Sequence, residues 1–196
     1  MNKIKNALLI AVMAFCANSS FAQMSDSKME NNKMERTVMV GGAAMYPTKN
    51  IVENAVNSKD HTTLVAAVKA AGLVETLQSK GPFTVFAPTN AAFDKLPAGT
   101  VETLLKPENI KTLQTILTYH VVAGKMNSSD IAKAIKKGKG KATLKTVSGG
   151  TLTAWMDGKD LYISDESGNK SKVTIADVNQ SNGVIHVVDT VLLPKN

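Results

Sequence analysis

The stretch GPFTVFAPTNAAF occupies residues 81–93 and predicts a strand that leads directly into a helix. Apolar and polar residues alternate across Phe83–Ala87, which is the pattern of a β-strand. A Gly-Pro pair precedes this strand and a proline follows it, so both of its ends are marked. Thr89 or Asn90 is placed to cap a short helix that carries Phe93.

Helices are expected around this stretch and strands further along the chain. Apolar residues recur at helical spacing near residues 50–56, 64–77, 90–96, 100–105, 107–117 and 130–136. After residue 140 the pattern changes to short runs typical of strands, at 142–147, 151–155, 160–164, 171–176 and 184–193. Glycine-containing turns, including an Asp-Gly pair, separate these runs. Helices first and strands later predict an α+β fold with an antiparallel sheet or sandwich.

The N-terminus predicts export. The chain has 196 residues, of which 43% are apolar, so one domain with a packed core is expected. Residues 1–22 have the charged start, the apolar run and the small residues of a secretory signal peptide. Cleavage there would remove Cys16, the single cysteine, whose surroundings are a poor lipoprotein site. No transmembrane segment is expected after cleavage.

A flexible, methionine-containing leader is expected over residues 23–46, followed by the folded domain over 47–196. Methionines recur in the leader at every fifth position, a spacing that fits neither a helix nor a strand. The alternative interpretation of these methionines is capture of a soft metal such as Cu(I). No histidine or cysteine stands nearby to complete a tight site, so a spacer is the preferred interpretation.

Lysines are concentrated in one region of a chain whose formal net charge is +7. Between residues 125 and 145 there are seven lysines and a single acid, Asp130. The basic patch named as a candidate site consists of Lys133, Lys136, Lys137, Lys139 and Lys141. Such a patch is either a solvated helix face or a contact surface for an acidic polymer. Nucleic acid is not expected as a partner, since no arginine or aromatic residue is interleaved with these lysines.

Signals for catalysis and metal binding are lacking in the sequence. The three histidines stand about 60 residues apart, with none of the paired spacings of metal ligands. There is no phosphate-binding glycine loop and no nucleophile elbow. We therefore expect no catalytic residues, no metal site and no cofactor. His186 is expected on one face of its strand with Val184 and Val188, and His120 is expected to be a polar anchor in the core.

Three segments together resemble the fasciclin-like domain family. Residues 81–93 resemble its first signature, and Tyr119-His120 followed by two valines resembles its central tyrosine-histidine motif. Residues 182–194, NGVIHVVDTVLLP, resemble its second signature. The resemblance covers about residues 48–194, and the three motifs occur in the family's order. The chain looks like a small, secreted, single-domain bacterial member.

The resemblance implies a wedge-shaped antiparallel β-sandwich, with short helices mainly from the N-terminal half, and an adhesion module in place of an enzyme. In animal members, integrin contact is associated with residues that correspond here to Tyr119, His120, Asp177 and Val178. The most recognisable residues of the signatures are expected to support the fold, namely Phe83, Phe86, Thr89, Asn90, Phe93, Gly183 and His186.

Two functions are therefore carried forward from the sequence. The first is a secreted, non-catalytic adhesion module that contacts a cell-surface or matrix protein or an acidic polysaccharide. The protein would be periplasmic, cell-surface or extracellular, and a monomer or weak oligomer. The alternative is a periplasmic sensory or small-ligand-binding subunit. An apolar pocket with polar groups pointing into it would favour that alternative.

Overall fold

The structure, a computed structural model, describes residues 37–195. These residues belong to Met34–Asn196, the larger of the two units into which the chain divides. The predicted signal peptide with Cys16, and most of the predicted leader, lie outside the described residues. Within the described range, no helix has both the length and the apolar character needed to cross a membrane.

Regular structure begins inside the expected leader. Strands β1 (Val38–Val40) and β2 (Ala43–Met45) form a two-stranded hairpin. The two glycines between the strands both have positive φ, as a two-residue hairpin turn requires. Regular structure is therefore already present at Val38, before the expected boundary at residue 47. Of the leader's methionines, Met39 is exposed and Met45 is buried, so these two do not share a face.

Short helices follow this hairpin and dominate the first half of the described chain. In chain order they are α1 (Ile51–Ala55), η1 (Lys59–His61), α2 (Thr62–Ala70), α3 (Val74–Gln78), α4 (Asn90–Asp94), α5 (Thr100–Leu104), η2 (Pro107–Asn109), α6 (Ile110–Tyr119) and α7 (Ser128–Lys137). Thr89 caps α4 by accepting from the Ala92 N–H at 3.3 Å, as expected. Helix α7 has Asn127 as its N-cap residue, and the Asn127 N–H donates to the Asp130 carboxylate at 3.2 Å.

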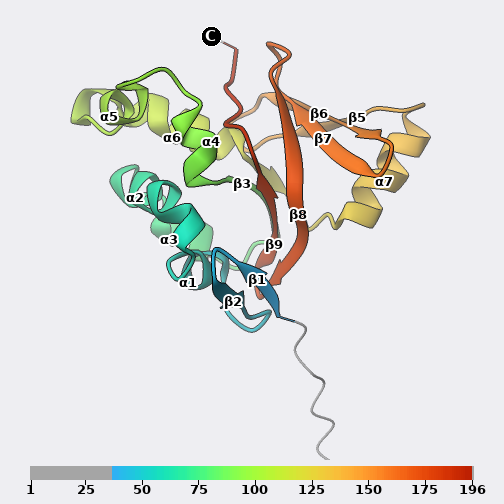
Figure 1. The fold of residues 1–196 in the computed structure, drawn as a ribbon, viewed down its shortest axis with the longest axis horizontal. Coiled ribbons are helices and arrows are strands. Elements are labelled where there is room, and N and C mark those ends of the chain that lie inside the picture. The colour runs from blue at the N-terminus through green and yellow to red at the C-terminus, as the bar shows by residue number, and fades with distance from the viewer. Residues whose placement is uncertain (1–36, 196) are drawn as a thin grey trace, which may run out of the picture. The chain divides into compact units, whose positions relative to one another are not determined.

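Seven further strands form one sheet. They are β3 (Phe83–Pro88), β4 (Val121–Ala123), β5 (Ala142–Lys145), β6 (Thr151–Asp157), β7 (Asp160–Ser164), β8 (Lys170–Gln180) and β9 (Gly183–Val188). Their order is β4-β3-β9-β8-β7-β6-β5 (Figure 1). Val122 of β4 also bridges to Thr146, directly after β5, so the sheet curls until its edges meet. The predicted α+β class with its β-rich second half is confirmed.

One strand pair departs from the antiparallel expectation. β3 and β9 run parallel, with Phe83 opposite Gly183 and Phe86 opposite His186, while the other pairs in the sheet are antiparallel. Gly183 begins β9, and its φ lies outside the left-handed region. Its role is close approach, because a Cβ at this position would overlap the backbone carbonyl of Phe83.

Two strands also end elsewhere than expected. β8 was expected to end at residue 176 but continues to Gln180, past register shifts on both sides of Ile175. Asp177 interrupts the strand's regular alternation, because its φ is +60°. The last strand was expected to reach residue 193, but β9 ends at Val188.

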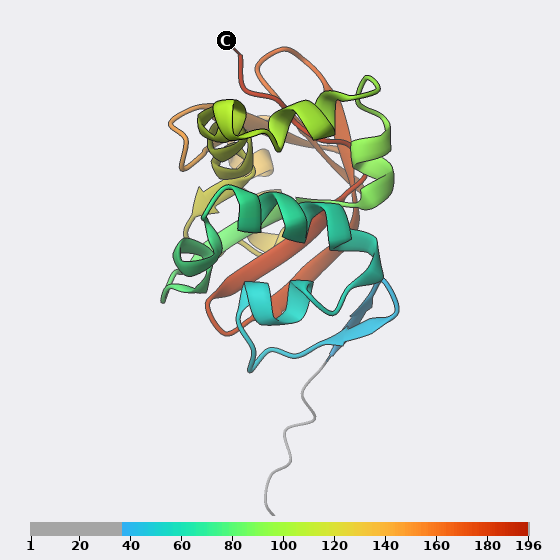
Figure 2. The ribbon, with the colours of Figure 1, turned by 90° about the vertical axis from the view of Figure 1, so that its left-hand side faces the viewer.

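The strands β4, β3, β9 and β8 have apolar residues on both faces. Alternate residues of β3 and β9 point to opposite sides, which explains why every residue of β9 is buried. On one side lies the helix-facing core, which includes Val85, Ala87, Ile185, Val187 and residues of α1, α2, α3 and α6. Figure 2 shows these helices in front of the red strands. On the other side lies the sheet-interior core, which includes Phe86, Tyr119, Ile131, Leu152, Ile163 and Leu192.

Candidate functional site

The tyrosine-histidine pair lies in the protein interior. Tyr119 ends α6 and is fully buried. Its hydroxyl donates to the Thr151 carbonyl at 2.7 Å and accepts from the Glu166 N–H at 3.3 Å. Burial raises the pKa of Tyr119 to about 12. The side chain is therefore a neutral link between α6 and the start of β6.

His120 connects α6 to the C-terminal segment. Its Nδ1 lies 2.9 Å from the Ile116 carbonyl, and its Nε2 accepts from the Leu192 N–H at 3.0 Å. Because Nε2 accepts, the ring proton is on Nδ1 and points at the carbonyl. Burial lowers the pKa of His120, which keeps the ring neutral. Both ring nitrogens are thus occupied, and the expectation of a polar core anchor fits this geometry.

Asp177 and Val178 occupy the middle of β8. The Asp177 carboxylate accepts from the Ser128 N–H at 2.6 Å and from the Ser128 hydroxyl. Asp177 thus supplies an acceptor for a backbone N–H in the first turn of α7, which has no partner within the helix. Val178 is 1% exposed and belongs to the helix-facing core. Adhesion through Tyr119, His120, Asp177 and Val178 stays a prediction, and three of the four have no surface for a partner to touch.

The remaining signature residues hold elements together. His186 is fully buried and stacks on Phe86 with ring centroids 5.6 Å apart. Its Nε2 lies 2.9 Å from the Met126 carbonyl, and its Nδ1 accepts from the Asp177 N–H at 3.4 Å. Asn90 does not cap its own helix. Its amide oxygen accepts from the Thr63 N–H at 3.0 Å, so it caps α2 instead.

Two asparagines that the sequence analysis did not single out join the helices to the sheet. Asn182 accepts from the Ile51 N–H at 3.1 Å and donates to the carbonyls of Leu77 and Ser79, each at 2.8 Å. Asn54 is fully buried and bonds to Tyr46 and Gln180. Asn182 precedes Gly183, and the sequence gives no signal that distinguishes its joining role from a turn.

The basic patch lies on α7 and the turn after it. Ile131 and Ile135 of α7 are buried against the sheet-interior core, which turns the lysines outward. Lys133, Lys136, Lys137, Lys139 and Lys141 are all exposed. Within the described part of the chain, Lys133 alone among them forms an ion pair, with Asp130 at 3.4 Å. The patch therefore carries a largely uncompensated positive charge.

An aromatic pair missed by the sequence analysis lies on the outer face of β6 and β7, opposite to the face that packs on α7. Trp155 of β6 stacks on Tyr162 of β7 with centroids 5.6 Å apart, and Lys170 lies 5.9 Å from the Trp155 ring. Ala142 pairs with Ala154, so the register places Lys141 next to Trp155 on the outward face. Alternation with the buried Leu152 and Ala154 is the signal that could have placed Trp155 there. Figure 1 shows α7, β5, β6 and β7 together, away from α1–α3.

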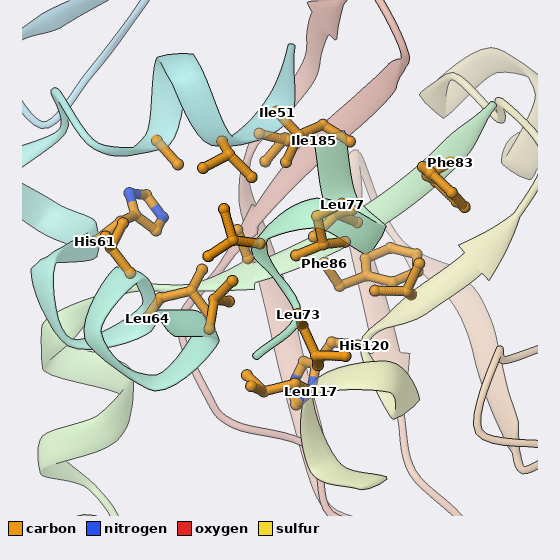
Figure 3. Close-up of a pocket in the computed structure, with 18 of the residues that line it drawn as sticks. Ile51, His61, Leu64, Leu73, Leu77, Phe83, Phe86, Leu117, His120 and Ile185 are labelled. Carbon is orange, nitrogen blue, oxygen red and sulfur yellow. The ribbon is translucent and has the colours of Figure 1, made fainter. Parts of the chain in front are cut away.

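A cavity of about 80 Å³ lies between the helices and the sheet. Its lining is apolar almost throughout and comes from α1, α2, α3, β3 and β9, among other elements (Figure 3). His61 stands at one end, with a ring nitrogen toward the apolar side chains (Figure 3). Burial lowers the pKa of His61. An interaction of the ring with the Ala87 backbone raises it, but by less. Among residues 37–195, no group of three or more histidine, cysteine or acidic side chains could hold a metal ion.

A curled seven-stranded sheet with short helices on one side defines the architectural class, and comparison with known proteins supplies the family. The family model described as Fasciclin domain matches residues 59–194. This chain belongs to the fasciclin domain family.

Relatives and a solved structure agree with this assignment. Protein sll1483 of Synechocystis is 45% identical over 186 residues, which cover 93% of this chain and 96% of the relative. Immunogenic protein MPB70 of Mycobacterium bovis is 38% identical over 145 residues, covering 71% of this chain and 66% of the relative. A FAS1 domain pair from the insect cell adhesion molecule Fasciclin I aligns with a TM-score of 0.65 at 19% identity, covering 74% of this chain and 51% of that one. The expected fasciclin-like fold is confirmed.

Proposed function

We propose that this protein is an exported, non-catalytic adhesion module that binds an acidic cell-surface polysaccharide. Residues 1–22 would direct export, and the domain would act in the periplasm, at the cell surface or outside the cell as a monomer or weak oligomer. The observation that carries the proposal is the group of exposed lysines on α7 and on the turn after it, which ends at Lys141 beside Trp155.

This surface suits a charged sugar polymer in two ways. Five exposed lysines with a single neighbouring acid attract carboxylate or sulfate groups. The aromatic pair offers flat apolar area beside Lys141, of the kind that recognition surfaces use. The family relationship supports a role in surface contact, because a relative is the cell surface glycolipoprotein MPB83 of Mycobacterium bovis. The same lysines would also attract a surface or matrix protein with an acidic face, which is the alternative partner.

The test is binding of the purified protein to whole cells and to extracted surface polysaccharide across a salt series. Because exposed charges are screened within about 8 Å at physiological ionic strength, we expect affinity to fall about tenfold or more as salt rises from about 0.05 to about 0.5 M. The variant replaces by serine the residues Lys133, Lys136, Lys137, Lys139 and Lys141. It should lose most of the binding.

The matched control removes the same charge elsewhere. It replaces by serine the exposed residues Lys59, Lys80, Lys106, Lys111 and Lys195. Full binding by this control, together with loss in the α7 variant, supports the proposed surface. Equal loss in both variants would show that only net charge matters, and binding that ignores salt would rule out the lysine mechanism.

The second candidate is the small-ligand-binding subunit, and the apolar cavity favours it. The cavity lies on the helix-facing side of the sheet, whereas the lysines lie on α7 beside the other core. Either function can therefore fail without the other.

A further inference from the structure

His61 differs from the other two histidines in having an unused ring nitrogen. Its ring is 3% exposed, and its Nδ1 lies 2.9 Å from the hydroxyl oxygen of Ser58. Nε2 is buried and makes no hydrogen bond of normal geometry, although the Ala87 backbone lies close enough to the ring to influence its pKa. In contrast, both ring nitrogens of His120 and both of His186 are bonded. A polar atom that is buried without a partner is rare and needs an explanation.

The contact with Ser58 identifies which form of the ring is favoured. Ser58 is 2% exposed, and within the described residues its hydroxyl forms one hydrogen bond, with the His61 ring. If Ser58 donates to Nδ1, the ring proton is on Nε2, and only this N–H donor lacks a hydrogen-bond partner. If Nδ1 donates to Ser58, both the serine hydroxyl proton and the Nε2 lone pair lack a hydrogen-bond partner. The first arrangement is favoured because each unmet buried group costs free energy. His61 therefore presents an Nε2–H donor.

The surroundings of this donor do not suit water. Nε2 faces a cavity whose lining is almost entirely apolar (Figure 3). An ordered buried water needs two to four polar partners, and this site offers it little besides Nε2. An apolar molecule with one accepting oxygen meets the same donor without leaving other polar groups unmet.

The dimensions of the cavity indicate the form of such a molecule. About 80 Å³ is shared among side chains that run from His61 along α2 to Lys69. Eight residues of helix span about 12 Å, so the space is narrow for its length. A narrow, elongated space suits an unbranched alkyl chain better than a fused ring system. Lys69 and Val147 belong to the lining and are exposed, so the cavity reaches the surface.

We propose that this cavity binds a short, unbranched aliphatic molecule with one carbonyl or ether oxygen, which accepts a hydrogen bond from His61 Nε2. The apolar chain lies along α2, against Leu64, Val68 and Leu73. This inference gives a site and a ligand class to the second candidate function and does not depend on the lysine surface.

The experiment compares two ligands that differ only at the proposed acceptor. The full-chain protein is titrated with 2-hexanone and with 2-methyl-1-hexene, in which a CH₂ group replaces the ketone oxygen. Binding is followed through the ring nitrogen and proton resonances of the three histidines by NMR. We expect saturable binding of the ketone, a shift of the His61 Nε2 resonance and smaller changes at His120. The alkene cannot accept this hydrogen bond and should leave the His61 Nε2 resonance unshifted, so the comparison with His61→Phe measures the contribution of the bond.

Two variants separate the hydrogen bond from the space. His61→Phe keeps an apolar lining and should lower the affinity for the ketone relative to the alkene about fivefold, because the ketone oxygen is then buried without a hydrogen bond. Val68→Phe keeps His61 but fills the cavity, and it should abolish binding of both ligands. The five-lysine serine variant should bind the ketone like the unchanged protein, which separates this test from that of adhesion. No saturable binding of either ligand, or ketone binding that leaves the His61 resonances unmoved, would overturn the proposal.

Discussion

The two faces of the central strands are packed in different ways. The sheet-interior core contains fully buried large side chains such as Phe86, Tyr119, Leu152 and Ile163, and the Tyr119 hydroxyl among them is hydrogen-bonded. The helix-facing core uses the opposite faces of the same strands but contains the cavity and the unpartnered His61 nitrogen. The difference lies in what covers each face.

A curled sheet closes on itself, whereas separate short helices cover a flat face incompletely. The sheet-interior core is enclosed by β5–β8, whose ladders fix neighbouring strands at one spacing. The helix-facing core is covered by α1, α2, α3 and α6, which are 5, 9, 5 and 10 residues long. Their positions depend on side-chain bonds such as those of Asn182. Space for a ligand is therefore expected under the helices and not within the curled sheet.

The largest expected effect tests this contrast with one leucine from each core. Leu152→Ala removes a fully buried side chain from the sheet-interior core and should lower the free energy of unfolding by about 4 kcal/mol. Leu77→Ala, in the helix-facing core, should cost about 2 kcal/mol, because the nearby helices can relax into existing space. Urea unfolding of both variants measures the difference. Equal losses would show that the two cores are equally tight.

A backbone substitution should damage the wall that the two cores share. Gly183→Ala places a Cβ against the Phe83 carbonyl, so β9 must move away from β3. We expect a loss of about 3 kcal/mol, at the upper end of overpacking effects. Ser181→Ala, at an exposed position two residues away, is the control and should be neutral. Unchanged stability of Gly183→Ala in urea would mean that the strands can separate freely.

Much of the fold could be predicted because its signals are local. Residues 81–93 carry the alternation, the prolines and the cap of β3 and α4 within one stretch. The parallel pairing of β3 with β9 was not predicted, since it joins residues 100 positions apart along the chain. The extension of β8 was missed because the left-handed Asp177 disrupts the two-residue period. The hairpin at Val38 had a local signal, its Gly-Gly turn between apolar residues.

The candidate sites divide in the same way. The α7 lysines could be identified by counting, because exposed charge is visible in the sequence. The cavity could not, because it is space left between side chains from segments that are distant in sequence. His61 was considered as an isolated histidine, and nothing in its neighbours shows that one nitrogen would lack a partner. Tyr119 and His120 were recognised by resemblance, which could not reveal that their atoms bond inside the protein.

The histidines give a smaller, pH-dependent effect. Burial lowers the pKa of His61, His120 and His186 in the folded state. The unfolded chain, with a histidine pKa near 6.5, therefore takes up protons first as the pH falls. Stability is fully present above about pH 6.5 and is lost below it, by up to about 1.4 kcal/mol per histidine between pH 7.5 and 5.5.

Unfolding measured across this range should show the contribution of each side of the sheet. His61→Phe should reduce the pH dependence, because it removes one of the three contributions. The same change should leave the losses from His120 and His186 in place. A pH dependence that His61→Phe does not alter would contradict the burial of a neutral His61 ring. Measurement between pH 7.5 and 5.5 avoids the range in which Asp189, whose pKa is lowered, becomes protonated.

The smallest expected effect is the most direct comparison of packing, because it adds one methylene group to each core. Val68→Ile lies beside the cavity and should stabilise the protein by about 0.5 kcal/mol, since the added carbon enters existing space. Val188→Ile lies in the sheet-interior core, where Val188 is fully buried, and should destabilise the protein by about 1 kcal/mol through overpacking. The two changes are chemically identical, so their difference in urea midpoint reports the space available on each side. Opposite signs follow only if the cavity is empty space under the helices, and a loss in both variants would mean that the helices close over it.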